Sequence, residues 1–480
     1  MPKTKIVATI SDRNADEQFI RSLYEEGMNV VRLNTAHQNP EQTLKVVETT
    51  RKVSEKIALL LDTKGPEVRT NQSEEDVQVK QGDEIRVEGN PRATSSGACI
   101  CLSYEKFADE VPVGSLVLID DGEVELTVRR KEGNQLVCEV NNSGVIKSRK
   151  SVNVPNVSLN LPSISEKDHE YIQFAIEHDL DFIAHSFVRS KEDVMGIQKI
   201  LDQHNSNIKI IAKIENQQGV DNANEILDVA YGIMVARGDL GIEIPYEKIP
   251  GIQRTLINTC IDRRKPVIIA TQMLHSMITN PRPTRAEVND IASAIYSKTD
   301  AVMLSGETAS GKYPVESVRV MARVAREVEA CKEPFNDIEA KVINNKVTAY
   351  LCKSAVKAAI RLEAKAVISD TTSGKTIRSL AAYRGQKPVY AQCYSQRTMR
   401  ELQLSYGVKP DYMNPRETSH EFLQEAINLL KTNYDFDDKD LVVVTAGNFG
   451  RNFGVTFIEI GTLDNLLGHF TPDQEEGKGV

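Results

Sequence analysis

The chain has 480 residues, of which 40% are hydrophobic and 26% charged. This length favours about three domains, and the composition excludes wholesale disorder, a collagen-like chain and a disulfide-dominated scaffold. The 59 basic and 68 acidic side chains give a formal net charge of −9. An acidic balance disfavours a dedicated nucleic-acid binder, but it is compatible with a local basic pocket for a phosphorylated metabolite.

The cysteine pattern and the N-terminal sequence favour a protein of the reducing cytoplasm. Seven cysteines are scattered along the chain without a Cys-x-x-Cys motif, which is typical of a reducing environment. The N-terminus leads directly into a β-like segment without the features of a signal peptide. No apolar run reaches the roughly 18 residues that a membrane span needs. We therefore expect a cytoplasmic protein.

Apolar strands alternate with amphipathic helices in two stretches of the chain. The rhythm begins at the N-terminus, stops near Thr70 and resumes with a capping-box pattern at Ser165. The strands are apolar on both faces, as parallel strands covered by helices are. Eight such units predict a (β/α)₈ barrel. The predicted barrel strands are 5–10, 29–34, 57–62, 181–187, 208–213, 232–236, 267–271 and 301–304.

Two further domains are expected. Short alternating β runs with hairpin signals at Asp121-Gly122 and Gly133-Asn134, and no convincing helix period, predict a β-rich domain inserted into the barrel. After Glu333-Pro334, helices alternate with strand-like runs at 366–369, 389–392, 441–446 and 456–460, which predicts a smaller α/β domain. The predicted domains are 1–70 with 154–334 for the discontinuous barrel, 71–153 for the β-barrel-like inserted domain, and 335–480 for the C-terminal α/β domain.

Polar residues gather at the C-terminal ends of the predicted barrel strands, where this fold places its active site. Period-two alternation puts Arg32 with Asn34, and Lys213 with Glu215, on the inward face. A charge pair that ends an apolar strand indicates a buried site, with a purely structural ion pair as the alternative. Together with Asp239 at the next strand end, Glu215 supplies the two carboxylates that commonly hold Mg²⁺.

Other segments have features that suit phosphate or carboxylate groups. Arg32 and Arg69 carry planar guanidinium groups that can donate two hydrogen bonds to a phosphoryl group. The glycine-flanked turn 237–241 could present backbone N–H groups to a carboxylate, or it could simply be a tight turn. The segment 372–376 lacks the first glycine of a phosphate-binding P-loop. It could still hold a small phosphate, with a plain helix cap as the alternative.

Several long motifs follow one another in a fixed order across the predicted barrel. They are Val31–Asn34 with His37, Leu61–Thr70, Ile211–Asn216, Ile233–Pro245, Ala270–Leu274, Pro281–Glu287 and Met303–Ala309. Together they resemble the pyruvate kinase family, and the inserted β-rich segment falls in the family's place. The C-terminal part resembles the family more weakly, in its layout and in Thr371–Thr376. The family resemblance implies that the predicted barrel is catalytic, the inserted domain a lid and the C-terminal domain regulatory.

The resemblance implies a phosphotransferase of the final step of glycolysis, which moves a phosphoryl group from phosphoenolpyruvate to ADP and gives pyruvate and ATP. It implies Mg²⁺ (or Mn²⁺) and K⁺ as cofactors. The implied catalytic residues are Arg32 for the phosphoryl group, Lys213 for the charge of the transition state and the enolate, and Thr271 for the proton path. The implied ligands are Glu215 and Asp239 for Mg²⁺, Gly238 and Asp239 for the substrate carboxylate, Arg69 and Lys150 for the nucleotide, and Asn34, Asp62 and Thr63 for K⁺.

Some positions depart from the family pattern. Ala36 stands where the family commonly has a serine whose hydroxyl binds K⁺, whereas Glu67 is the residue type that accompanies K⁺ dependence. We therefore predict K⁺ activation with weakened affinity. Thr456–Ile460 replaces the family's Gly-Gly-Thr-Asn segment, so the resemblance does not extend to the usual effector, fructose 1,6-bisphosphate. A homotetramer and a phosphorylated effector near Thr371–Thr376 are the expectations that remain.

Two other function classes fit part of the pattern. A Mg²⁺-dependent lyase or aldolase of pyruvate-type enolates would explain Glu215 and Asp239, but not Lys213, Lys150 or the lid. A non-catalytic metabolite sensor would not need the complete set of barrel-mouth residues. In the kinase interpretation, the lid closes over the barrel mouth and excludes water that could otherwise accept the phosphoryl group.

Overall fold

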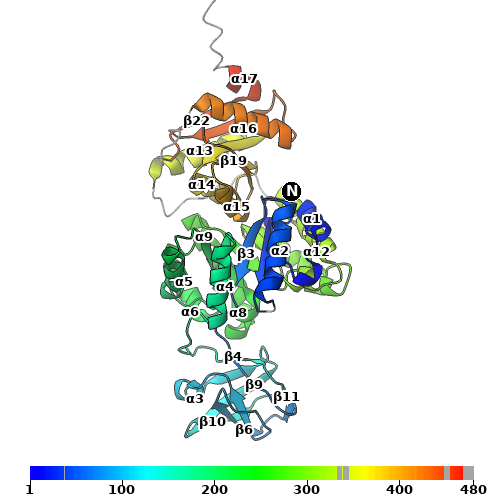
Figure 1. Ribbon diagram of the computed structural model, residues 1–480, viewed down its shortest axis with the longest axis vertical. Coiled ribbons are helices and arrows are strands. Elements are labelled where there is room, and N and C mark those ends of the chain that lie inside the picture. The colour runs from blue at the N-terminus through cyan, green and yellow to red at the C-terminus, as the bar shows by residue number, and fades with distance from the viewer. Residues whose placement is uncertain (37, 332–337, 339–344, 417, 448–453, 469–480) are drawn as a thin grey trace, which may run out of the picture.

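The computed structural model describes the chain except residues 37, 332–337, 339–344, 417, 448–453 and 469–480. Three sheet systems follow one another along its long axis: the C-terminal sheet, the barrel, and the β-rich insertion at the opposite end (Figure 1). The predicted boundary at Glu333-Pro334 lies outside the described residues. No helix in the described ranges combines the length and the apolar character needed to cross a membrane.

The central unit is a closed barrel of eight parallel strands, as the alternation of strands and helices predicts. Each strand is an apolar run because one face fills the barrel interior and the other packs against the outer helices. In spatial order the barrel is β1 (Lys5–Thr9), β17 (Ala301–Leu304), β16 (Val267–Ala270), β15 (Gly232–Ala236), β14 (Lys209–Ile214), β13 (Phe182–His185), β3 (Ala58–Asp62) and β2 (Val30–Asn34).

Two of the barrel helices show a clear local sequence signal at one end. Ser165 and Asp168 form a capping box, and Gly27 ends its helix with φ +119°. The helices of this unit are α1 (Glu17–Glu26), α2 (Pro40–Val53), α4 (Glu166–Glu177), α5 (Lys191–Gln203), α6 (Gln217–Asp221), α7 (Ala223–Val229), α8 (Arg237–Glu243), α9 (Ile249–Arg263), α10 (Arg285–Tyr296), α11 (Gly306–Ala309) and α12 (Pro314–Ala330).

The insertion has its own hydrophobic core and two sheets. The predicted hairpin turns join β8 to β9 and β9 to β10. One short helix, α3 (Phe107–Glu110), lies where no helix period was evident, because four residues are too few to show one. Its strands are β4 (Val68–Arg69), β5 (Val77–Val79), β6 (Glu84–Gly89), β7 (Cys99–Leu102), β8 (Leu116–Ile119), β9 (Val124–Glu132), β10 (Gln135–Val140), β11 (Gly144–Ile146) and β12 (Ser151–Asn153).

The C-terminal unit is a five-stranded sheet of order β20-β19-β18-β21-β22, parallel except for β22. The edge strand β20 was not predicted, because Pro410 interrupts its pattern and proline is tolerated mainly at sheet edges. Its elements are α13 (Lys346–Arg361), β18 (Ala366–Thr371), α14 (Lys375–Ala382), β19 (Val389–Cys393), α15 (Gln396–Glu401), β20 (Val408–Tyr412), α16 (Ser419–Asn433), β21 (Leu441–Ala446), β22 (Phe457–Thr462) and α17 (Leu463–Gly468).

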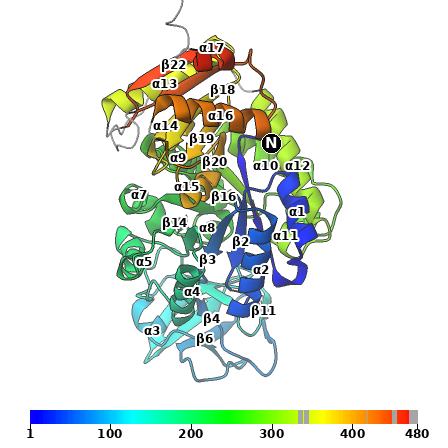
Figure 2. The same ribbon diagram turned by 45° about the horizontal axis from the view of Figure 1, so that its top comes forward.

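The C-terminal unit packs on the barrel end opposite the insertion, through α14, α15 and the chain N-terminus (Figure 2). Arg384 donates to both carboxylate oxygens of Asp300, at 2.9 and 2.7 Å, and this ion pair is almost fully buried. Arg400 pairs with the buried Asp181 at 2.5 Å. Charged pairs as well as apolar contacts therefore fix the barrel to this unit.

Candidate active site

Asp62 connects two cations at the carboxyl end of the barrel. The Arg32 Nε donates to Oδ2 of Asp62 at 2.6 Å, and the Lys213 Nζ lies 3.0 Å from Oδ1. Burial alone would raise the pKa of Asp62, but Arg32 and Lys213 outweigh it and hold that pKa below its usual value. The strands β2, β3 and β14 thus deliver a carboxylate and two cations to one point.

Glu215 follows β14 and is almost fully buried beside Lys213. One of its oxygens lies 2.9 Å from the Lys213 Nζ, and the other accepts the backbone N–H of Phe187 at 2.6 Å. Burial raises the pKa of Glu215, and the nearby charge of Asp239 adds to this, while Lys213 opposes both. Asp239 lies half-buried in the first turn of α8. Two carboxylates therefore share one electrostatic environment.

Thr271 and Gly238 contact one another directly. The Gly238 backbone N–H donates to Oγ1 of Thr271 at 2.8 Å, and this hydroxyl donates to the Ala270 carbonyl at 2.7 Å. Thr271 has φ +68°, a strained backbone for a β-branched residue. The Gly238 N–H, which the family resemblance assigns to the substrate carboxylate, therefore already donates to the Thr271 side chain. A substrate would have to replace that bond.

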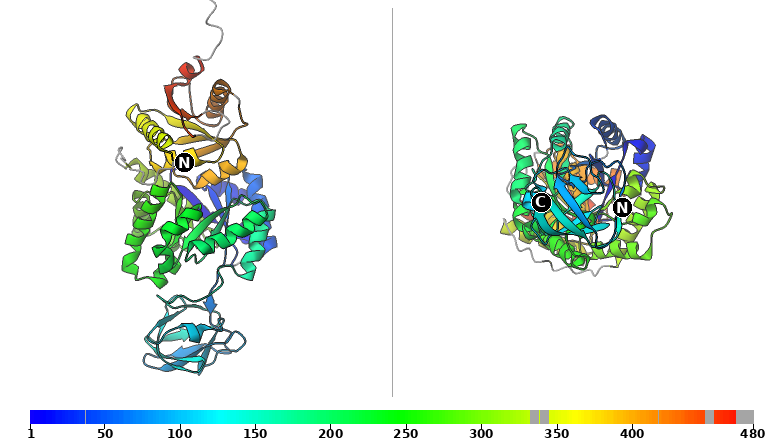
Figure 3. Two further views of the ribbon diagram at one scale, coloured as in Figure 1. Left: turned by 90° about the vertical axis from the view of Figure 1, so that its left-hand side faces the viewer. Right: turned by 90° about the horizontal axis from the view of Figure 1, so that it is seen from below.

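Lys150 lies on the insertion, and Arg69, just before its predicted start at residue 71, pairs with Ser151 of the insertion's sheet. Both line a cavity of about 610 Å³ that Asp239 at the barrel mouth also lines. Arg69 pairs with Glu67 at 2.8 Å and donates to the Arg149 carbonyl at 2.7 Å. Lys150 pairs with Asp120 at 2.8 Å, and this hydrogen bond raises its pKa. Figure 3 shows the insertion joined to the barrel by two narrow connections. The cavity has room for a nucleotide, and its walls include both cations and Asp239.

The residues predicted to bind K⁺ lie at the ends of β2 and β3. Oδ1 of Asn34 accepts the Ala36 backbone N–H at 3.2 Å, and Ala36 itself is exposed. Thr63 donates to the Ala184 carbonyl at 3.3 Å. Both oxygens of Asp62 are paired with cations, as described above. His37, part of the quoted motif, lies outside the described residues.

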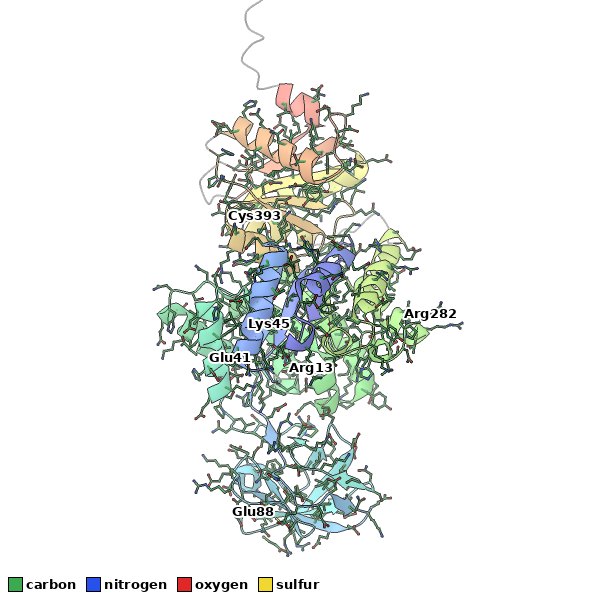
Figure 4. All side chains as sticks on the ribbon, turned by 45° about the vertical axis from the view of Figure 1, so that its right-hand side comes forward. Arg13, Glu41, Lys45, Glu88, Arg282 and Cys393 are labelled. Carbon is green, nitrogen blue, oxygen red and sulfur yellow. The ribbon has the colours of Figure 1, made fainter. Side chains whose placement is uncertain are left out.

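The segment Thr371–Thr376 begins at the carboxyl end of β18. Thr371 pairs in register with Cys393 of the neighbouring strand, and Cys393 lies at the junction with the barrel (Figure 4). Gly374 has φ +73° and donates its N–H to the Thr371 hydroxyl at 2.8 Å. Arg378 of α14 stacks on the ring of Tyr231 in the barrel. The predicted effector segment therefore lies against the barrel.

Two positioning contacts at the site were not predicted from the sequence. The Lys213 Nζ donates to Oγ of Ser186 at 2.7 Å, and Oδ1 of Asp168 accepts the N–H of Lys64 at 2.9 Å. Ser186 follows β13, a strand end for which no site residue was predicted. It continues the inward alternation of Phe182 and Ala184, which is the signal that could have identified it.

A closed barrel with paired cations and carboxylates at its mouth, next to a separate β-rich unit, is the architecture of a barrel enzyme whose site suits a small anionic substrate. Residues 1–318 match the family model described as "Pyruvate kinase, barrel domain", and residues 350–459 match "Pyruvate kinase, alpha/beta domain". The chain belongs to the pyruvate kinase family.

Individual relatives agree with this assignment. A pyruvate kinase of Borreliella burgdorferi is 47% identical over 469 residues, covering 97% of this chain and 98% of that protein. One from Staphylococcus aureus is 41% identical over 496 residues, covering 100% of this chain and 82% of that protein. The crystal structure of a pyruvate kinase from Cryptosporidium parvum has a TM-score of 0.91 at 35% identity, covering 96% of each chain.

The activity is accordingly that of the family, phosphoryl transfer from phosphoenolpyruvate to ADP with formation of pyruvate and ATP. The lyase or aldolase alternative finds no support in these comparisons.

Proposed function

We propose that Lys213, Arg32 and Thr271 are the catalytic residues of this phosphoryl transfer. The observation that carries the proposal is the arrangement of Arg32 and Lys213 on the two oxygens of Asp62, which fixes two cations in a buried site. Transfer of a phosphoryl group needs positioning and charge stabilisation more than covalent chemistry. Arg32 binds the transferring group, and Lys213 stabilises the charge that develops on it and on the enolate left behind.

Thr271 and Gly238 complete the substrate site in this proposal. The backbone N–H groups of Gly238 and Asp239 receive the substrate carboxylate at the start of α8, where helix N–H groups lack internal partners. The hydroxyl of Thr271, which now accepts the Gly238 N–H, is released when the carboxylate binds. It then belongs to the proton path that converts enolpyruvate into pyruvate.

Glu215 and Asp239 are the proposed ligands of Mg²⁺ or Mn²⁺. The described residues hold no cluster of three or more His, Cys, Asp or Glu able to bind a metal, so a divalent ion here would depend on two carboxylates plus waters and substrate oxygens. That is how Mg²⁺ is commonly held. The buried Glu215 oxygen beside Lys213 makes no hydrogen bond of good geometry, which leaves it available to a metal. When bound, the ion neutralises charge on the substrate.

Asn34, Asp62 and Thr63 are the proposed K⁺ ligands. They come from two neighbouring strand ends and offer amide, carboxylate and hydroxyl oxygens, a donor set that suits a hard cation. Ala36 lacks the hydroxyl that the family pattern would add, so we propose K⁺ activation with weakened affinity.

Arg69 and Lys150 are the proposed nucleotide contacts. Each side chain forms an ion pair with a nearby carboxylate, Arg69 with Glu67 and Lys150 with Asp120, and a phosphate group could replace that carboxylate.

We further propose that 71–153 acts as a lid on 1–70 and 154–334, and that 335–480 is regulatory. The position of Thr371–Thr376 against the barrel suits a phosphorylated effector there. A homotetramer and a cytoplasmic location complete the proposal.

A coupled assay for pyruvate tests this assignment. Purified protein is given phosphoenolpyruvate and ADP with Mg²⁺ and K⁺, and pyruvate is reduced by lactate dehydrogenase. We expect turnover that depends on both substrates and on the divalent ion. Absence of turnover under these conditions, from a folded sample, would contradict the proposed roles.

A further inference from the structure

Ser186 occupies the inward position directly after β13 and is almost completely buried. It lies between the end of β3 and the end of β14, the two strands that carry Asp62 and Lys213. The mechanism proposed above gives it no role. Its hydroxyl oxygen nevertheless accepts a hydrogen bond from Lys213, the central cation of the site.

Three side-chain oxygens of the described residues lie close to the ammonium group of Lys213. Its Nζ lies 3.0 Å from Oδ1 of Asp62, 2.9 Å from Oε1 of Glu215 and 2.7 Å from Oγ of Ser186. The carboxylates provide ion-pair contacts, whereas the contact with Ser186 is a hydrogen bond, which fixes the rotation of the ammonium group as well as its position. Ser186 is the neutral member of this set, and it supplies the shortest of the three contacts.

The hydroxyl of Ser186 is itself held in one orientation. It donates to the Thr63 carbonyl at 2.6 Å, whereas Oδ1 of Asp62 is 3.4 Å away. A hydroxyl has a single proton, so the bond to Thr63 turns an oxygen lone pair toward Lys213. The Ser186 backbone N–H donates to Oγ1 of Thr63 at 3.0 Å, which ties the backbone of Ser186 to the same residue.

Gly65 packs directly against Ser186. It has φ +71°, and a Cβ built at this position would lie 2.7 Å from the Cβ of Ser186. The loop after β3 therefore approaches Ser186 as closely as a glycine permits. This contact leaves the serine little space to move.

We infer that Ser186 is a positioning residue for Lys213, which holds the ammonium group in the orientation that meets the transferring phosphoryl group. The inference rests on the proposed catalytic role of Lys213. A misdirected ammonium group still provides charge to the site, so substrate affinity changes little. It stabilises the transition state less well, and the loss is in turnover.

The test compares Ser186→Ala with a matched control, Ser317→Ala. Ser317 is also buried and donates to a backbone carbonyl, that of Tyr313, at 2.7 Å, but it lies on α12 away from the site. We expect Ser186→Ala to lower kcat about ten- to hundredfold, the range for a hydrogen bond to a charged group, with little change in the KM for phosphoenolpyruvate. Ser317→Ala should keep the wild-type kcat.

A double-mutant cycle separates positioning from a general structural role. In a Lys213→Met background, Ser186→Ala should lower the residual kcat no further, because the group that Ser186 positions is gone. Equal additional losses in both backgrounds, or a wild-type kcat in Ser186→Ala, would overturn the inference. A wild-type enzyme without turnover would instead contradict the proposed function, so the two failures are distinguishable.

Discussion

The Lys213 ammonium nitrogen lies 3.0 Å from Oδ1 of Asp62, in a site from which water is largely excluded. Burial alone would lower the pKa of Lys213, but Asp62 and Glu215 outweigh it and raise that pKa above its usual value. The lysine therefore stays charged throughout the physiological range. This contact makes Lys213 a permanent cation rather than a proton donor or acceptor.

Replacing Lys213 with methionine should abolish most turnover without removing the divalent-ion site. We expect kcat to fall about a hundredfold or more, as when an electrostatic stabiliser of the transition state is removed. Mn²⁺ binding, followed by electron paramagnetic resonance, should persist because Glu215 and Asp239 remain and a nearby positive charge is lost.

Glu215→Gln is the matched comparison for this experiment. It keeps Lys213 but removes a proposed metal ligand, so Mn²⁺ affinity should fall sharply. A Lys213→Met protein that no longer bound Mn²⁺, or one with normal kcat, would show that the roles are assigned wrongly.

Ala36→Ser should tighten the activation by K⁺. Ala36 is exposed and its N–H is held by Asn34, so a hydroxyl can be added beside the proposed ligands without displacing a packed side chain. We expect the K⁺ concentration for half-maximal rate to fall severalfold, measured at saturating substrates with a large inert cation keeping the ionic strength constant. An unchanged K⁺ dependence would argue against a cation site next to residue 36.

Arg189 links the insertion to the barrel and should influence lid closure. Its guanidinium donates to the carbonyls of Leu159 and Leu161 at 3.0 Å each, while both leucine side chains pack against the core of the insertion. On the other side, Glu110 accepts the N–H of Asn160 at 2.8 Å. The segment 159–161 is therefore held by the barrel and by the insertion together.

Arg189→Ala should loosen this connection. We expect faster hydrogen exchange at residues 159–161 and a severalfold higher KM for ADP, with a smaller effect on the KM for phosphoenolpyruvate. Arg189→Lys keeps the charge but cannot reach both carbonyls with one planar fork, so it should be intermediate. Unchanged exchange in both variants would exclude Arg189 as an anchor of the lid.

The features best predicted from the sequence are those with a regular pattern over a few neighbouring residues. Apolar runs located all eight barrel strands, and inward alternation placed Lys213 and Glu215 side by side. Ser186 was not predicted as a site residue because the apolar pattern places it inside the strand 181–187, whereas β13 ends at His185. The buried pair of Arg384 with Asp300 has no local signature, since the two residues are 84 positions apart and belong to different sheet systems.

Lys5 is a buried lysine at the start of β1, where the barrel meets the C-terminal unit. Its ammonium group donates to the Val408 carbonyl. Burial, together with Lys409, lowers the pKa of Lys5 to about 7, although Glu329 and Asp300 oppose the change. The unfolded chain binds this proton up to its ordinary pKa of about 10.4. Between these two values the unfolded state holds more protons, so stability should rise with pH.

Lys5→Met should therefore stabilise the protein most at low pH. Below about pH 7 the folded wild type carries a buried charge that the methionine variant lacks, which gives the variant the higher melting temperature. As the pH rises toward 10, the wild-type lysine becomes neutral in the fold and the difference should shrink. Differential scanning calorimetry at several pH values measures it, with the exposed Lys52→Met as the control. A Lys5→Met difference that stayed constant from pH 6 to 10, or grew, would contradict the titration of Lys5.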